Sequence, residues 1–238
     1  MVTLTGPSPE SGSHNASAPD QRDDLSDNSH RQLIGYIGLA LPVILVLLAG
    51  IRPTAGLPRW GILESISAYY YTGAVAAFVG MLVALALFLI TYRGYRNKYN
   101  RMDRATAVTA GCAAVGVAFF PVEAPNGIPA LTWWSKAVGV THYVSAVVLF
   151  SMFALFSLWL FRLATSDHPP ADKRRRNRIY LTCGLAIIAS MAWAGIAGAN
   201  DRPIFLPESL ALVAFAVSWL VKGRAPKTIA DAVRSVVS

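Results

Sequence analysis

The chain has 238 residues, of which 54% are apolar and 14% are charged, and its net charge is +8. Soluble domains carry about 25% charged residues, so this composition is that of a membrane protein and excludes an ordinary soluble domain. A strongly basic soluble protein would suggest a nucleic-acid partner. Here the basic residues lie in short segments between long uncharged stretches, which indicates contact with a membrane surface, and we expect no nucleic-acid partner.

Residues 1–32 are rich in Ser, Pro, Asp and Asn and contain no apolar stretch, so we expect a disordered tail without a cleavable signal peptide. Six apolar stretches follow, and each approaches the roughly 20 residues that a helix needs to cross a bilayer. They comprise residues 33–51, 72–92, 105–120, 139–161, 179–199 and 204–222. The sequence therefore predicts an all-α fold, a polytopic bundle of six transmembrane helices over residues 33–222.

Small residues recur within two of these stretches. The third contains Gly111 and Gly116, and the fifth carries Ser190, Ala194 and Gly198 at four-residue spacing. Small side chains let helix backbones approach closely in lipid, where no hydrophobic effect draws helices together. We therefore expect the third and fifth helices in the interior of the bundle, and we expect the second and fourth helices to be more exposed to lipid.

The basic residues orient the bundle. If both termini are cytoplasmic, 17 of the 21 lysines and arginines lie on the cytoplasmic side, in the two tails and in the segments 93–104 and 162–178. This is the positive-inside pattern. The C-terminal segment 223–238 is also basic, and its apolar residues fit either a short amphipathic helix on the inner leaflet or a frayed tail. We expect a multi-pass protein with both termini in the cytoplasm.

This topology places several polar residues at one depth, near the outer face of the membrane. The segment ESISAYYYTG, residues 64–73, precedes the second helix, Glu123 follows the third, His142 lies in the first turn of the fourth, and Glu208 begins the sixth. An ionisable side chain within a span is a functional hypothesis by default. The candidate ligand-binding residues are Glu64, Ser67, Tyr70, Glu123, His142 and Glu208.

Simpler explanations exist for the members of this set. Glu208 follows a proline, which is a usual start of a helix. Tyr69 and Tyr71 fit the aromatic belt at a membrane interface, whereas Tyr70 can face the interior. His142 also fits a hydrogen bond to a neighbouring helix.

Together, His142, Glu64 and Glu208 could hold a divalent metal, or they could form a general acid–base set. A single histidine near a span is too few for an intramembrane zinc hydrolase or for a haem with two histidine ligands. The sequence also contains no glycine loop that binds phosphate. We therefore expect neither haem nor nucleotide as a cofactor.

Several segments resemble a family of bacterial six-helix integral membrane proteins, which is described as a domain of unknown function. The segments are ESISAYYYT, FLITYRGY, VAFFP, THYVSAVVLF, RNRIYLTCG and ESLALVAFAVSWLVKG. They cover most of residues 33–223. The resemblance implies a six-helix fold and a location in the bacterial inner membrane, and it assigns no catalytic residues.

Three functions are compatible with these features. The first is a non-enzymatic membrane protein that binds a lipid, a small ligand or a protein partner through an outward-facing polar pocket, because the polar residues gather at one depth without a complete catalytic set. The second is a metal-assisted hydrolase that acts at the outer leaflet. The third is a small transporter or channel subunit. We expect membrane lipid as a partner, together with another membrane protein or a second copy of the chain.

Overall fold

The computed structural model describes residues 18–94, 99–163 and 171–225. Over these residues the chain forms six α-helices, two short 3-10 helices and no strand. The elements are α1 (Ala18–Ile51), η1 (Ser67–Tyr71), α2 (Val75–Thr91), α3 (Asn100–Phe119), α4 (Lys136–Leu158), η2 (Leu160–Arg162), α5 (Ala171–Gly198) and α6 (Phe205–Lys222). The predicted all-α fold is confirmed, and each predicted apolar stretch corresponds to one α-helix.

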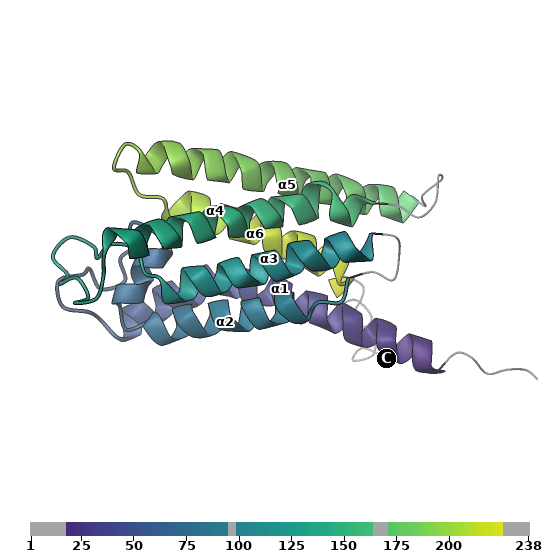
Figure 1. Cartoon of the computed structure of the whole chain (residues 1–238), viewed down its shortest axis with the longest axis horizontal. Coiled ribbons are helices and arrows are strands. Elements are labelled where there is room, and N and C mark those ends of the chain that lie inside the picture. Colours follow the sequence, from purple (N-terminus) through teal and green to yellow (C-terminus); the bar gives the residue numbers. More distant parts are fainter. Residues whose placement is uncertain (1–17, 95–98, 164–170, 226–238) are drawn as a thin grey trace, which may run out of the picture.

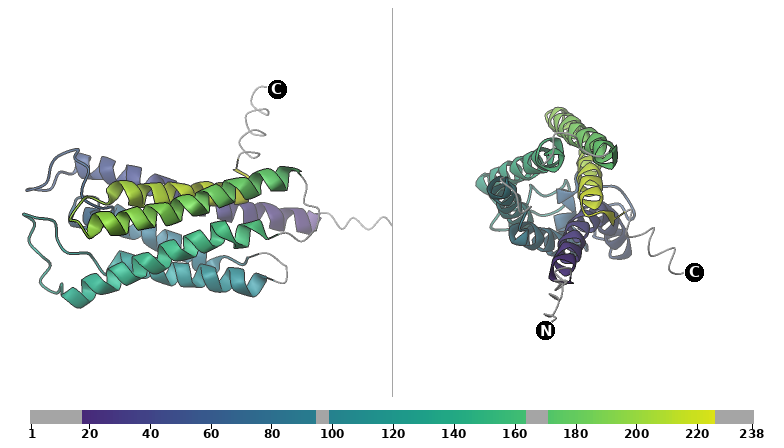
Figure 2. Two further views of the ribbon diagram at one scale, coloured as in Figure 1. Left: turned by 90° about the horizontal axis from the view of Figure 1, so that it is seen from above. Right: turned by 90° about the vertical axis from the view of Figure 1, so that its right-hand side faces the viewer.

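The α-helices form a ring in chain order, with their axes roughly along one direction (Figures 1 and 2). Each helix packs against the next one in the chain, and α6 packs against α1 and closes the ring. Helices α4 and α6 also contact each other across the ring. The rings of Phe153 and Phe215 stack there with their centroids 3.5 Å apart, and Ser157 Oγ donates a hydrogen bond of 2.9 Å to Ser218 Oγ. This crossing contact leaves α5 outside the α4–α6 pair.

Four of the described helical segments are long and apolar enough to cross a membrane: Asp27–Ile51, Lys136–Arg162, Asp172–Gly198 and Phe205–Lys222. The two remaining α-helices, α2 and α3, do not meet both criteria of length and composition. Helix α2 is apolar but has 17 residues, and the first turns of α3 carry Arg101, Asp103 and Arg104. By length and composition the chain is therefore a membrane protein with several spanning helices.

Helix α1 begins before the predicted span. It starts at Ala18, so part of the predicted disordered tail 1–32 is helical. The polar residues at this end of α1 make contacts that a composition cannot reveal: His30 Nε2 donates to the Phe88 carbonyl at 2.6 Å, and Gln32 Nε2 donates to the Gly223 carbonyl at 2.8 Å. Residues 1–17 and the predicted amphipathic segment after residue 225 lie outside the described residues.

The small residues are closely packed in α3 but not in the second half of α5. A Cβ atom at Gly111 would lie 2.5 Å from Ile90 Cγ1, and one at Gly116 would overlap the Ser145 side chain, so α3 packs closely between α2 and α4 as expected. In α5, a Cβ atom at the predicted Gly198 would have only Ile204 Cγ2 within 4 Å, at 3.9 Å, and one at Gly195 would meet open space. The expectation that α5 is interior is wrong, because the α4–α6 contact excludes it: 28% of its spanning window is buried, against 39% in α4.

Candidate functional site

All candidate residues lie at one end of the ring, which we call the long-loop end because it carries the loops 52–66, 120–135 and 199–204 (Figure 1, left). The last residues of α2 and α4 and the first residues of α3 and α5 lie at the opposite end (Figure 1). The structure therefore gathers the candidate residues from loops and helix ends that are far apart in the sequence.

The loop before η1 is tied to the start of α6 by reciprocal hydrogen bonds. The backbone carbonyl of Glu64 accepts from the amides of Ile204 and Phe205, at 2.6 and 2.9 Å. In return, Glu208 Oε2 accepts from the Ile66 amide at 2.6 Å. The first amides of a helix have no hydrogen-bond acceptor within it. The loop supplies an acceptor for the amides at the start of α6, and α6 supplies an acceptor for an amide of the loop. Glu64 takes part through its main chain, and its side chain is exposed.

His142 links three elements at the centre of this end. Its side chain is 2% exposed, Nδ1 lies 2.6 Å from the Phe120 carbonyl oxygen, and Nε2 lies 2.8 Å from Ser67 Oγ. A carbonyl oxygen only accepts, so Nδ1 carries a proton. In the neutral ring Nε2 is then the acceptor, and the Ser67 hydroxyl donates to it. The chain of hydrogen bonds runs from η1 through α4 to the residue that follows α3.

A cavity of about 30 Å³ lies beside these residues in the middle of the ring. Ser67 and Glu208 are the polar side chains that line it, and its remaining lining is apolar, from α1, α2, α3, α4 and α6. Leu41, Phe150 and Leu212 belong to this apolar lining. A cavity needs roughly 10–15 Å³ of such space to hold one water molecule. The cavity therefore has room for a few water-sized groups between a hydroxyl and a carboxyl group.

The tyrosines are arranged differently from the prediction. Tyr69 is fully buried, and its hydroxyl lies 3.4 Å from both the Leu63 amide and the Gly61 carbonyl. Tyr70, which the sequence suggested as the inward residue, is only partly buried and contacts the rings of Tyr71 and Phe78. Burial raises the pKa of the Tyr69 phenol, so it remains a protonated hydroxyl that holds the loop onto the bundle.

The proposed metal ligands do not converge. Among the residues that the structure describes, no group of three or more His, Cys, Asp and Glu side chains could hold a metal ion. The side chains of Glu64 and Glu123 are exposed, and both ring nitrogens of His142 already have partners. The geometry therefore does not support the predicted ligand set of His142, Glu64 and Glu208.

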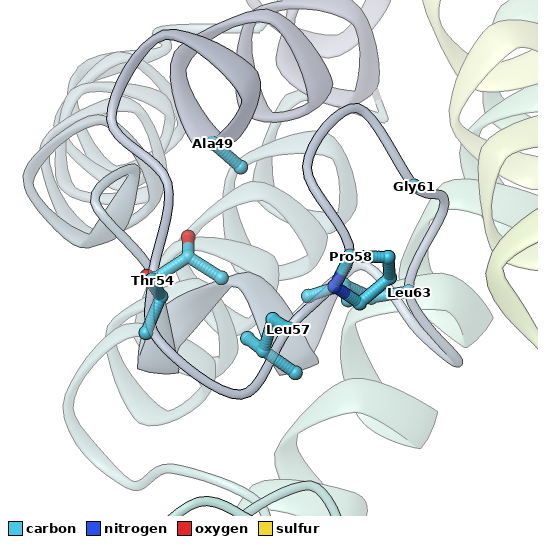
Figure 3. Close-up of a pocket in the computed structure, with 7 residues that line it drawn as sticks. Ala49, Thr54, Leu57, Pro58, Gly61 and Leu63 are labelled. Atoms are coloured by element: carbon cyan, nitrogen blue, oxygen red, sulfur yellow. The ribbon is translucent and has the colours of Figure 1, made fainter.

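A second and smaller cavity, of about 10 Å³, lies beneath the loop that follows α1 (Figure 3). The end of α1, the loop and Thr72 after η1 supply its lining, with Thr54, Leu57 and Leu63 among the residues drawn. A cavity needs roughly 10–15 Å³ to hold even one water molecule. We interpret this space as a packing gap and not as a ligand site.

Sequence reasoning selected Ser67, His142 and Glu208, which the structure brings to the cavity region, but it missed the Phe120 carbonyl. A signal for this acceptor was present in the sequence, because Phe120 precedes Pro121. Proline has no amide proton and ends a helix, so carbonyl groups in the last turn of α3 are left for partners outside the helix.

No protein-family model, no curated protein and no solved structure matches this chain. The resemblance to a bacterial family of six-helix membrane proteins therefore stays a prediction, and the function has to be inferred from the geometry of the site.

Proposed function

We propose that the chain is a six-span protein of the bacterial inner membrane with both termini in the cytoplasm. The apolar helix α2 supports this, since its 17 residues reach about 25 Å at 1.5 Å per residue, close to the thickness of a bilayer core. The charged residues of α3 lie in its first turns, at the end opposite the long-loop end. The excess of basic residues in the tails and in segments 93–104 and 162–178 supports the orientation.

Within this bundle, the function that the geometry supports best is the binding of an amphiphile, a lipid or a small apolar molecule with a polar group, at the long-loop end. One observation carries the proposal: the cavity places the Ser67 hydroxyl and the Glu208 carboxyl group on an otherwise apolar wall. Ligand sites typically combine an apolar lining with a few placed polar groups. The polar group of the ligand would contact Ser67 and Glu208, and its apolar part would lie along the leucine and phenylalanine side chains.

The cavity is too small for a large ligand. Its volume of about 30 Å³ admits a few water-sized groups but no acyl chain. Binding of a lipid therefore requires that the apolar side chains of the lining, such as Phe150 of α4 and Leu212 of α6, move apart.

Native mass spectrometry of the protein from a mild detergent tests this proposal. We expect the wild-type protein to carry a discrete lipid or small molecule, and we expect the Leu212→Trp variant, which fills the cavity, to lose it. Val213→Trp is the matched control because Val213 is the next residue on α6 and is exposed, and this variant should keep the bound molecule. Wild-type protein without any bound molecule, or equal occupancy in all three proteins, would contradict the proposal.

A further inference from the structure

Ser67 and His142 have the arrangement of a nucleophile and its base. Ser67 Oγ lies 2.8 Å from Nε2 of His142, and Nδ1 is held at 2.6 Å by the Phe120 carbonyl. An activated serine is recognised by a base within hydrogen-bond reach and by a third group that orients the base. The three members come from η1, from α4 and from the residue after α3, so the tertiary structure assembles them.

A comparison within the same bundle separates this pair from a purely structural contact. Ser157 and Ser218 also form a buried hydrogen bond, of 2.9 Å, but they line neither of the two cavities described above. Ser67, in contrast, lines the apolar cavity. A hydroxyl that both donates to an imidazole and lines a cavity is placed to meet a ligand.

Glu208 acts on this pair through the backbone. Its carboxyl group accepts from the Ile66 amide at 2.6 Å, and Ile66 directly precedes Ser67. This hydrogen bond fixes the position of η1 relative to α6. We assign Glu208 as a positioning residue for the serine.

We propose that Ser67 and His142 form a nucleophile–base pair that cleaves the carboxylic ester of an amphiphile at the outer membrane boundary. Ser67 Oγ attacks the ester carbonyl carbon, and Nε2 of His142 takes the hydroxyl proton while the Phe120 carbonyl holds the imidazolium through Nδ1–H. The tetrahedral intermediate then breaks its bond to the alcohol oxygen, which receives the proton from Nε2 and leaves. Water attacks the resulting acyl-serine by the same route, which releases the acid and restores Ser67.

This inference rests on the proposed function, because the pair would act on the amphiphile that the cavity binds. It adds the substrate class, a carboxylic ester, and the bond that is cleaved. It also replaces the metal-assisted route considered from the sequence with one that uses a serine and a histidine.

Labelling with an alkyl fluorophosphonate tests the inference on the full chain in membranes. The reagent forms a P–O bond to an activated serine and releases fluoride, and peptide mass spectrometry locates the label. We expect the label on Ser67 of the wild-type protein, no label in Ser67→Ala, and labelling slower by roughly 10²-fold or more in His142→Gln, since general-base catalysis contributes about 10²–10⁴-fold. Ser65→Ala is the matched control, because Ser65 is a buried neighbour whose hydroxyl accepts from the Ala68 amide.

The outcomes distinguish the reactive pair from the proposed binding of an amphiphile. Wild-type protein that retains its bound molecule but takes no label overturns the reactive pair and leaves ligand binding intact. A label on another residue, or equal rates in the wild-type protein and His142→Gln, also overturns the pair. The site of labelling is read from the wild-type protein, so the result does not depend on whether Ser67→Ala folds.

Discussion

The hydrogen bond from the Ile66 amide to Glu208 predicts a measurable loss of stability when the acceptor is removed. The two atoms lie 2.6 Å apart and Ile66 is buried, so Glu208→Ala leaves a backbone donor without its acceptor. Such a loss costs about 1–3 kcal/mol. Glu208→Gln keeps a carbonyl oxygen at the same place, and we expect it to cost less than Glu208→Ala.

The free energy of unfolding can be measured for each variant by reversible denaturation in mixed micelles. Ser209→Ala is the control, because the buried Ser209 Oγ has no hydrogen-bond partner and its removal should not lower the free energy of unfolding. Hydrogen exchange supplies a local readout: Glu208→Ala should speed the exchange of the Ile66 amide. If Glu208→Ala is as stable as the wild-type protein, or if Glu208→Gln is as damaging as Glu208→Ala, the carboxyl group does not act as the acceptor that holds the loop.

Two further predictions concern the topology and the packing of the bundle. In a variant without the native cysteines, a cysteine at Asn126 should react with an impermeant thiol reagent from outside intact cells and one at Arg174 should not; the reverse pattern would overturn the orientation. Gly111→Val should destabilise the bundle by about 1–3 kcal/mol because the new side chain collides with Ile90. The same change at Gly195, where a Cβ atom meets open space, should not, and equal effects in a denaturation assay would mean that α3 is not packed as described.

The positions of the helices could be predicted because each depends on a local property, a long apolar stretch between charged segments. The arrangement of the helices could not. Helix α5 lies outside the bundle interior because α4 and α6 contact each other, where Phe153 stacks on Phe215. The sequence pattern of one helix does not show which other helix it will contact. The small residues of α5 therefore gave the wrong prediction, although the same signal was right for α3.

The sequence predicted at which end of the bundle the candidate residues lie, but not which of their side chains point into the bundle. The positive-inside pattern placed six residues near one level of the membrane, and Ser67, His142 and Glu208 do come together there. Which side chains point inward depends on the path of the loop: Glu64 contributes its carbonyl instead of its carboxylate. Tyr69 is buried and Tyr70 is only partly buried. Both lie in the 3-10 helix η1, and its three residues per turn determine which of the two side chains faces the bundle. The sequence did not predict a 3-10 helix at this place.

The hydrogen bonds of the long-loop end also determine how the site would respond to a ligand. The Glu64 carbonyl and the Ile66 amide both bond to α6, so the loop, Ser67 and the start of α6 belong to one unit. His142 belongs to α4 and is held by the carbonyl that follows α3. The cavity lies between these two units, with Phe150 on α4 and Leu212 on α6, and the hydrogen bond between Ser67 and His142 joins them. A ligand that moved α6 away from α4 would therefore also separate Ser67 from His142.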